Sequence, residues 1–504
     1  MSEPIARRKI IMDYRIKASK CEMCGKVYFP PKSFCNLEGR VSKVVESDYF
    51  YSKGIFYSGC VIRKPTNKFN YLKSFISCIV SFDNGTVKVP GRITDYRLNN
   101  DDEIDITQYI GKGVIPRFRR IYDDGNFGLI YYSSFNFSFE DDYYPYQEYK
   151  VVKPSGKSDK PGIIGYGIYI PKFRIKGDEN SRELGILERA LPFADEDATT
   201  FAVEAGKRAL IHSAINSQYI KKCYVGSESA PYVVKPSMAT ISQVLELGEK
   251  FDDGFFSGGV DAQFACKAAT DLIIDAAALV NYPTFNGEYV MIIGSDNAQA
   301  APNDPLDFSV GAGAAAFIIG KRDVIATIDY YISYTSDTPD FYRRDGCEYP
   351  KHGGRFTGEP AYFKHVCTVM KRALKDTNLS PRDINYVVLH SPNAKFPMAA
   401  ALQVGFEKDQ IEPGLIVKKV GNLYSGSSLA ALGAVLDISK PGDKILMVSY
   451  GSGAGSDAYL FTVTKNIESK RERLIKVQDQ IENPHREYVD YYTYREWKTK
   501  NHPL

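Results

Sequence analysis

One cysteine of this chain, Cys266, stands where a protein could use it for covalent chemistry. It opens a predicted helix, AATDLIIDAAAL at 268–279, that is apolar almost all round and is therefore expected to be buried. The N-terminus of a helix carries partial positive charge, which lowers the pKa of a thiol and favours the thiolate. Cys266 follows the glycine-containing stretch FFSGGVDAQ and is a candidate nucleophile; the alternative is a small core cysteine.

The elements that must hold this cysteine belong to a region that begins near residue 155. Before it, short segments rich in Tyr, Phe, Val and Ile, broken by turns such as DNG at 83–85, predict a small all-β module. The stretch 151–162, VVKPSGKSDKPG, is rich in Lys, Pro, Ser and Gly and predicts a linker. Beyond it, helical and strand-like segments alternate, which predicts an α/β fold.

The α/β region repeats its own pattern of strand, small-residue helix, strand, glycine-rich turn and strand. The first half contains CYVGSES, the Cys266 helix, EYVMIIGSDNA and GAGAAAFIIG. The second contains YVVLHSPN, GNLYSGSSLAALGAVLDI, KILMVSYGSGAGS and DAYLFTV. Two such halves packed together would bury both helices between sheets. We place the halves at 163–325 and 326–465, followed by a charged, Tyr-rich helical tail over the surface at 466–504.

The composition is that of an ordinary globular protein. Of 504 residues, 44% are hydrophobic and 25% charged, and the net charge of +3 gives no electrostatic reason to expect nucleic acid or an anionic membrane as a partner. We find no signal-peptide h-region and no apolar run long enough to span a membrane. The nine cysteines are scattered, which favours a reducing cytoplasm over a disulfide framework.

The stretch 161–504 resembles hydroxymethylglutaryl-CoA synthase of the archaeal type, in the thiolase superfamily. The resemblance rests on segments that follow in order: GIIGYGIYIP, DEDATT, VGSESAPYVVKPS, FACKAAT, SDNAQAAPND, HGGRFTGEPAYFKH, HSPNAKFP, GNLYSGSS, SYGSGAGSDA and YVDYYTY. It implies the duplicated five-layered α/β/α/β/α thiolase fold. It also implies condensation of acetyl-CoA with acetoacetyl-CoA and hydrolysis to 3-hydroxy-3-methylglutaryl-CoA in the mevalonate pathway, with no cofactor for catalysis.

The resemblance assigns catalytic roles to three residues. Cys266 matches the acyl-accepting cysteine, Glu228 in VGSES the general acid/base and His390 in HSPNAK the catalytic histidine. Glu228 and His390 follow corresponding strands of the two halves, so the pseudo-symmetry is expected to bring both to Cys266. The alternatives are a helix-capping glutamate and a buried, hydrogen-bonded histidine.

Further residues are candidates for binding the substrate. The resemblance places Lys395 near the phosphates of coenzyme A, and the alternative is a solvated surface lysine. Asn422 lies in a small-residue turn and Ser452 in GSGAGS, and we expect both to line the pocket. The remaining candidates for phosphate or carboxylate contacts are Arg344, Arg355 and Lys235.

The N-terminal part resembles the zinc-ribbon/OB-fold proteins that accompany acyl-CoA enzymes, with a knuckle at 1–40 and a β module at 41–150. In KCEMCGKVYFPPKSFC, the residues Cys21, Cys24 and Cys35 favour tetrahedral zinc, with Glu38 at the fourth position. Because Cys₃Glu is an unusual ligand set, a knuckle packed without metal is the alternative. In the archaeal pathway such a module bridges the synthase to an acetoacetyl-CoA thiolase, which makes a thiolase a candidate partner.

Two questions stay open at this point. Arg117, Arg119 and Arg120 cluster around Phe118 and could form a nucleic-acid surface, a solvated basic loop or a contact to coenzyme A phosphates; the solvated loop is favoured over nucleic acid. The competing functions are a different condensing acyltransferase of the ketoacyl synthase III type, and a non-catalytic acyl-CoA-binding scaffold. The family leads us to expect a homodimer or a dimer of dimers.

Overall fold

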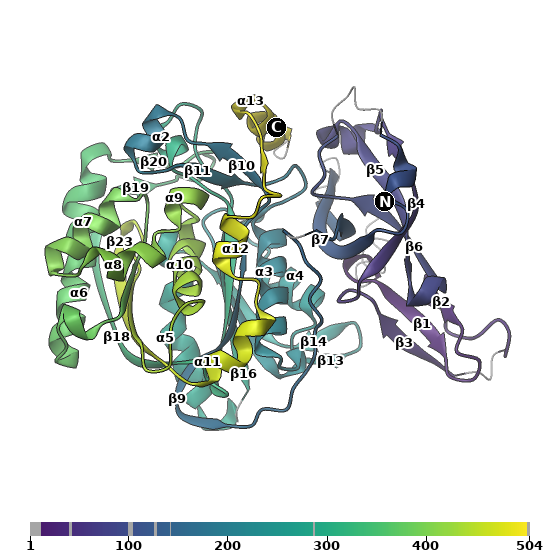
Figure 1. Cartoon of the computed structure of the whole chain (residues 1–504), viewed down its shortest axis with the longest axis horizontal. Coiled ribbons are helices and arrows are strands. Elements are labelled where there is room, and N and C mark those ends of the chain that lie inside the picture. Colours follow the sequence, from purple (N-terminus) through teal and green to yellow (C-terminus); the bar gives the residue numbers. More distant parts are fainter. Residues whose placement is uncertain are drawn as a thin grey trace. The chain divides into compact units, whose positions relative to one another are not determined.

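The computed structural model describes residues 12–39, 43–98, 104–124, 129–141, 143–285 and 288–500 (Figure 1). The chain folds into two compact units. Unit 1 comprises Met1–Tyr149, Phe193–Glu196 and Tyr492–Leu504, and unit 2 comprises Lys150–Pro192 and Asp197–Tyr491. No helix in the described part of the chain is both long and apolar enough to cross a membrane.

Unit 2 is built around nine hydrogen-bonded strands in two similar groups. The first group, in spatial order, is β15 (Gly258–Ala262), β12 (Ile220–Gly226), β16 (Tyr289–Asp296), β17 (Gly313–Arg322) and β9 (Lys157–Tyr169). The second group is β18 (Ala326–Thr338), β23 (Gly453–Val463), β22 (Lys444–Val448) and β21 (Tyr386–Leu389). The two groups are joined where β9 and β18 pair, at Ile163↔Ala326 and Gly162↔Thr327.

The pairing directions repeat between the two groups. β12 runs parallel to β16, which is antiparallel to β17, and β17 is antiparallel to β9. In the second group β21 runs parallel to β22, which is antiparallel to β23, and β23 is antiparallel to β18. β12 therefore corresponds to β21, and the duplication predicted from the sequence is present in the topology.

Helices cover both faces of these strands (Figure 1). α3 (Ala198–Ser213) starts with a capping box between Asp197 and Thr200 and packs on β9 and β17. α5 (Ala268–Asn281) packs on β12 and β16, and α10 (Ser427–Leu436) on β17 and β21. Both contribute to a single apolar core. α10 is buried almost all round, whereas α5 exposes Asp275 and Asn281 on one side, so it is less completely buried than the sequence predicted. On the other side of the second strand group, α6 (Phe363–Thr377) packs on β18 and β23.

Smaller elements complete unit 2. The helices are α2 (Glu179–Glu183), α4 (Ser237–Leu245), α7 (Lys395–Val404), α8 (Lys408–Ile411), α9 (Val417–Val420), α11 (Asn466–Lys470) and α12 (Val477–Ile481). The remaining strands are β10 (Phe173–Lys176), β11 (Glu188–Leu191), β24 (Glu487–Tyr488), β13 (Glu249–Phe251), β14 (Gly254–Phe256), β19 (Phe341–Tyr342) and β20 (Lys351–His352).

Two segment boundaries differ from those predicted. β9 begins at Lys157, inside the stretch predicted as a linker, because Lys157 pairs with Arg322 of β17. The tail at 466–504 does not simply cover the surface: Ile467, Val477 and Ile481 are buried in the core of unit 2. The high content of charged residues in this segment hid these apolar anchors. α13 (Tyr491–Lys500) ends the described chain.

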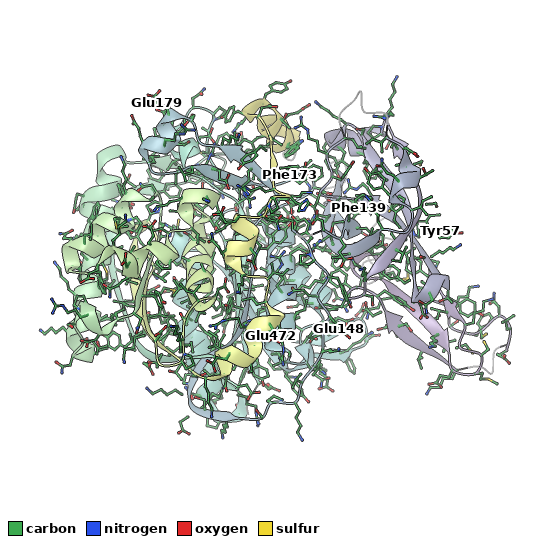
Figure 2. The ribbon with its side chains drawn as sticks, viewed as in Figure 1. Tyr57, Phe139, Glu148, Phe173, Glu179 and Glu472 are labelled. Atoms are coloured by element: carbon green, nitrogen blue, oxygen red, sulfur yellow. The ribbon has the colours of Figure 1, made fainter. Side chains whose placement is uncertain are left out.

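Unit 1 contains a closed five-stranded β barrel and a small sheet. The barrel strands are β4 (Gly54–Ile62), β5 (Phe75–Phe82), β6 (Val87–Ile93), β8 (Leu129–Phe139) and β7 (Gly113–Asp124). The sheet consists of β2 (Val27–Tyr28), β1 (Lys17–Cys21) and β3 (Val44–Asp48). Side chains alternate along the barrel strands: Phe56 is buried and Phe139 packs against the core, whereas Tyr57 is 47% exposed (Figure 2).

The three arginines around Phe118 are buried inside unit 1. Arg119 Nη2 lies 2.8 Å from Asp95 Oδ2 and 3.2 Å from Glu196 Oε1. Arg117 Nε donates to Ser138 Oγ at 2.9 Å, and Arg120 Nη2 donates to the carbonyl oxygen of Ala194 at 3.1 Å. The predicted solvated loop is therefore wrong, and the nucleic-acid and phosphate alternatives lack the exposed guanidinium groups that they need. The acids that pair with Arg119 lie far away in the sequence, which is why the segment looked like a free basic patch.

Candidate active site

Cys266 lies in a buried 3₁₀ turn, Ala265–Lys267, that leads directly into α5. Its side chain is 7% exposed, and its Sγ donates a hydrogen bond to Glu228 Oε1 at 3.1 Å. Glu228 follows β12, which packs against α5, so the fold brings together two residues that are 38 positions apart in the sequence. The predicted pair of thiol and carboxyl is thus within hydrogen-bonding distance.

The turn that carries Glu228 is held by Asp296, the last residue of β16. Asp296 Oδ1 accepts hydrogen bonds from the backbone N–H of Glu228 at 2.8 Å and from that of Ser229 at 3.0 Å. Its other oxygen accepts the backbone N–H of Ser425 at 2.9 Å. One buried carboxylate therefore fixes a turn from each half of unit 2. Sequence reasoning missed Asp296, because a single aspartate at a strand end has no distinctive pattern.

Burial sets the protonation states of the pair. Desolvation, followed by the charge of Asp296, raises the pKa of Glu228 to about 8. The pKa of Cys266 is raised well above its usual value, first by burial and then by the Glu228 carboxylate. The sequence predicted a lowered thiol pKa at a helix start. That prediction is wrong for the free protein, because burial beside acidic groups outweighs the positive end of the helix.

Asn422 stands in the second half where Cys266 stands in the first. It lies just before the turn Tyr424–Gly426 that leads into α10. A hydrogen bond from the Asn422 side chain to Cys266 acts to lower the pKa of the thiol, and Asn422 Oδ1 accepts the backbone N–H of Tyr424 at 2.9 Å. Asn422 was predicted to hold the substrate, and in the structure it contacts the nucleophile itself.

His390 follows β21, the counterpart of β12, and is 2% exposed. Burial lowers its pKa to about 3, so the imidazole is neutral. The Tyr362 hydroxyl donates to the His390 carbonyl oxygen at 2.7 Å. The His390 ring lies 6.3 Å from that of Tyr450, which also interacts electrostatically with Cys266. His390 Nδ1 is buried and has no hydrogen-bond partner among the described residues, which leaves it available to a substrate.

The other predicted binding residues are less closely tied to the thiol. Ser452 hydrogen-bonds to Tyr450, next to the site. Lys395 is exposed at the start of α7, and Arg344 is exposed in the segment after β19. Lys235 Nζ donates to Thr240 Oγ1 at 2.8 Å and lies over the Tyr232 ring. Arg355 lies in the helical turn Gly354–Thr357, and its side chain is outside the described part.

A buried ion pair next to the nucleophile was not foreseen. Lys267 Nζ lies 3.2 Å from Asp457 Oδ1, and both side chains are fully buried. Asp457 belongs to β23 of the second half, so the pair joins the Cys266 turn to the opposite strand group. In the sequence Lys267 reads as an ordinary helix-surface charge, and no local signal indicates a partner 190 residues away.

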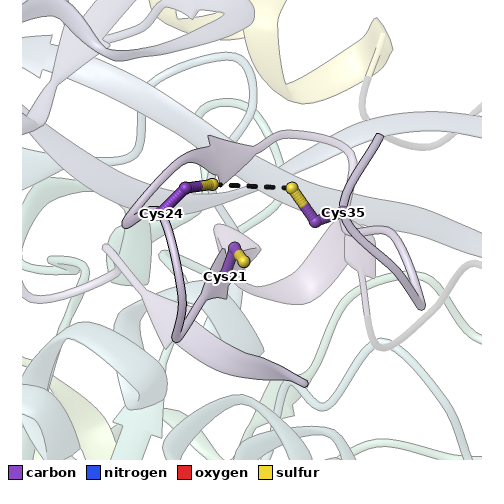
Figure 3. Close-up of side chains that lie close together, drawn as sticks. All are labelled: Cys21, Cys24 and Cys35. Carbon is purple, nitrogen blue, oxygen red and sulfur yellow. Dashed lines mark hydrogen bonds between the residues drawn. The ribbon is translucent and has the colours of Figure 1, made fainter. Parts of the chain in front are cut away.

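In unit 1, three thiols converge as the sequence predicted. Cys21, Cys24 and Cys35 have their Sγ atoms within 4.8 Å of one another, and Cys24 Sγ lies 3.6 Å from Cys35 Sγ (Figure 3). Three thiols at this spacing fit a tetrahedral zinc ion. The predicted fourth ligand does not join them: Glu38 is exposed, and its carboxylate is outside the cluster. Instead Tyr28 Oη lies 3.1 Å from Cys35 Sγ.

Two family models and several curated relatives match parts of this chain. Residues 374–463 match the 3-oxoacyl-[acyl-carrier-protein (ACP)] synthase III C terminal family, and residues 8–36 match ChsH2, rubredoxin-like zinc ribbon domain. The hydroxymethylglutaryl-CoA synthase of Methanopyrus kandleri is 44% identical over 354 residues, 68% of this chain and 98% of its own. That of Thermoplasma acidophilum is 46% identical over 351 residues, 67% of this chain and 97% of its own.

Solved structures share the fold. MvaS in complex with 3-hydroxy-3-methylglutaryl coenzyme A superposes with a TM-score of 0.59 at 19% identity, covering 68% of this chain and 92% of its own. An HMG-CoA synthase complexed with CoA gives 0.59 at 20% identity, covering 67% of this chain and 90% of its own. The predicted thiolase fold and N-terminal zinc ribbon are thus confirmed. This chain belongs to the hydroxymethylglutaryl-CoA synthase family.

Proposed function

We propose that this protein condenses acetyl-CoA with acetoacetyl-CoA and hydrolyses the adduct to 3-hydroxy-3-methylglutaryl-CoA, in the mevalonate pathway. The observation that carries the proposal is the hydrogen bond between Cys266 Sγ and Glu228 Oε1, 3.1 Å long, in a buried site. A nucleophile in contact with an acid/base group of raised pKa is the arrangement that covalent acyl transfer followed by carbon acid chemistry needs.

Acetylation uses the pair directly. Glu228 in its carboxylate form takes the thiol proton as Cys266 Sγ attacks the carbonyl carbon of acetyl-CoA. The bond from that carbon to the sulfur of coenzyme A then breaks, and the leaving thiolate takes the proton from Glu228. The enzyme now carries an acetyl thioester, and Glu228 is again a carboxylate.

Condensation uses the same carboxylate on a weaker acid. Glu228 removes a proton from the methyl group of acetyl-Cys266, and the resulting enolate attacks the ketone carbon of acetoacetyl-CoA. His390, as a neutral imidazole, donates a hydrogen bond to the ketone oxygen where negative charge develops; such a donor is typically worth about 3–4 kcal/mol. The alkoxide takes the proton from Glu228. Water, deprotonated by Glu228, then cleaves the thioester, and the Cys266 thiolate recovers that proton.

The decisive experiment mixes purified protein with the two thioesters and looks for free CoA and 3-hydroxy-3-methylglutaryl-CoA by mass spectrometry. Cys266→Ser should give neither labelled acetyl-enzyme nor product. Wild-type rates of product formation in that variant would remove the nucleophile assignment.

A second candidate follows from the match of residues 374–463 to the synthase III family, which points to a different condensing acyltransferase. In that case the same assay yields a longer ketoacyl thioester, such as the triketide formed from an acetyl and an acetoacetyl unit with release of CoA, instead of 3-hydroxy-3-methylglutaryl-CoA. A non-catalytic scaffold predicts acyl-CoA binding with no turnover, and the contact between Cys266 and Glu228 argues against it because a scaffold needs neither group.

We further propose that the chain forms a homodimer through β15. This strand is at the edge of the nine-stranded sheet, where it pairs with β12 alone among the described strands. Val260 of this strand is 52% exposed and Phe256 of β14 is 59% exposed, and an unpaired edge strand with exposed apolar side chains favours pairing with a second copy. Val260→Lys should shift the molar mass measured by light scattering toward that of the monomer, and an unchanged mass would rule out this interface.

The N-terminal unit is the element that would recruit an acetoacetyl-CoA thiolase, and co-sedimentation of the full chain with that thiolase tests this.

The nine free cysteines of the two units support a cytoplasmic location, because thiols stay reduced there. Lys395, Ser452, Arg344, Arg355 and Lys235 remain predicted contacts to coenzyme A.

A further inference from the structure

Gln299 is a buried polar residue beside the active site to which the reaction described above gives no role. It lies three residues beyond Asp296, after β16, and is 8% exposed. The Tyr424 hydroxyl donates to the backbone carbonyl oxygen of Gln299 at 3.0 Å, and the backbone N–H of Tyr424 donates to Asn422 Oδ1. On this side Gln299 is attached to the turn that carries Asn422.

On its other side Gln299 is attached to the turn that carries Glu228. Arg343 Nη1 donates to Gln299 Oε1 at 3.2 Å, and Arg343 Nη2 donates to the Glu228 carbonyl oxygen at 3.1 Å. Glu228 and Asn422 are the two residues whose side chains hydrogen-bond to the Cys266 thiol. Gln299 therefore lies between the two turns that flank the nucleophile.

Arg343 determines the orientation of the Gln299 side-chain amide, that is, where its oxygen and its nitrogen lie. A guanidinium group only donates hydrogen bonds, so the atom that faces Arg343 must be the amide oxygen. The amide nitrogen then faces away from Arg343. Gln299 Nε2 is buried and has no acceptor among the residues that the structure describes. An unpaired buried donor is unfavourable, and an arriving acceptor removes that cost.

We propose that Gln299 recognises the β-ketoacyl thioester acceptor by donating a hydrogen bond from Nε2 to its thioester carbonyl oxygen. This assignment deepens the proposed function and rests on it. The acceptor brings two carbonyl oxygens into the site, whereas the acetyl donor brings one. His390 is assigned to the ketone, so the thioester carbonyl is the acceptor oxygen that still needs a buried donor. Arg343 acts as a positioning residue, because it keeps the amide in the donating orientation.

The test compares two ligands in binding and turnover. Gln299→Leu removes the donor without adding charge, and Gln478→Leu, an exposed glutamine on α12, is the matched control. By calorimetry, Gln299→Leu should weaken acetoacetyl-CoA roughly 10-fold to 100-fold, the effect of leaving one polar group unpaired. The thioether S-(3-oxobutyl)-CoA, which keeps the ketone but lacks the thioester carbonyl, should bind wild type and Gln299→Leu equally.

Kinetics separate recognition from a general structural effect. In Gln299→Leu, kcat/KM for acetoacetyl-CoA should fall with the binding constant, and by a larger factor than the rate of Cys266 acetylation by acetyl-CoA. Gln299→Glu still accepts from Arg343 but presents an oxygen to the ligand, so it should bind acetoacetyl-CoA less well than Gln299→Leu does.

Equal weakening of the thioester and the thioether, or unchanged binding of both, would overturn the assignment. The binding measurement does not require turnover. A wild-type protein that binds acetoacetyl-CoA through Gln299 yet forms no six-carbon product would therefore refute the proposed reaction while leaving the assignment of Gln299 intact.

Discussion

Replacing Glu228 by Gln tests the chemistry of the site most directly, since the amide keeps the shape of the side chain but cannot accept a proton. Condensation should slow by roughly 10²-fold to 10⁴-fold, the usual contribution of a positioned base. Acetylation should slow less, because a thiol loses its proton far more readily than a methyl group does. The two steps are followed separately, by labelled acetyl-enzyme after a short pulse and by product formation.

The pH dependence of condensation also tests the role of Glu228, because its raised pKa predicts the direction in which the rate changes with pH. Burial raises the pKa of Glu228 to about 8, and only the carboxylate can remove the methyl proton. At pH 7 roughly one-tenth of the protein therefore has an ionised base. The value of kcat/KM for acetoacetyl-CoA should rise about tenfold per pH unit below pH 7 and about fivefold from pH 7 to pH 8, and it should level off above about pH 9. The amide that replaces this carboxyl group does not titrate, so the rise should be absent in Glu228→Gln.

Two results would refute this reasoning. The first is condensation by Glu228→Gln within tenfold of the wild-type rate, which would give proton abstraction to another group. The second is a wild-type profile that levels off near pH 5, which would mean that burial does not raise the pKa of this carboxyl group. If Glu228→Gln does not acetylate and its unfolding temperature differs from that of the wild type, the variant is misfolded. Glu228→Asp then serves as the test, since it keeps a carboxylate base but moves it away from the substrate.

Three further predictions concern the surroundings of the site and unit 1. Asp296→Asn should lower the pH at which kcat/KM levels off, because it removes the negative charge that raises the pKa of Glu228; an unshifted pH profile contradicts this. Arg119→Met should cost about 3–5 kcal/mol in urea unfolding, since it strands buried Asp95 and Glu196, whereas the exposed Lys20→Met should cost little; equal costs would contradict the buried pairing. Cys24→Ser should lower bound zinc, measured by elemental analysis, from about one equivalent to well below it; a full equivalent in the variant excludes this ligand.

The fold could be predicted because its signals are local and repeated. A helix that is mostly apolar, β-rich segments before residue 150 and a pattern that recurs in two halves are all visible in the residues themselves. The pair of Cys266 and Glu228 followed from that repeat together with the family resemblance. Glu228 and His390 both stand after equivalent strands, and the structure places those strands, β12 and β21, in equivalent positions.

The partners of buried charges could not be predicted from the sequence. Lys267 and Arg119 look like surface cations, and each is fully buried against acids that are distant in the sequence. Glu38 occupies the right position for a zinc ligand, yet its side chain is exposed. The raised pKa of Cys266 was missed for the same reason: the charge at a helix start is a local property, whereas burial beside Glu228 and Asp296 depends on the whole fold.

Burial shifts the pKa values of Glu228 and His390 in opposite directions, and both shifts favour the uncharged form of the side chain. It raises the pKa of the Glu228 carboxyl to about 8 and lowers that of the His390 imidazole to about 3, so at pH 7 both are mostly uncharged. The Cys266 thiol is also neutral. The resting site therefore presents three uncharged polar groups to an uncharged acyl chain, and charge develops only as each proton moves. Because the pKa of Glu228 is about 8, only about one-tenth of the protein has the carboxylate form at pH 7. That carboxylate is a stronger base than an ordinary glutamate, and this basicity helps it remove a proton from carbon.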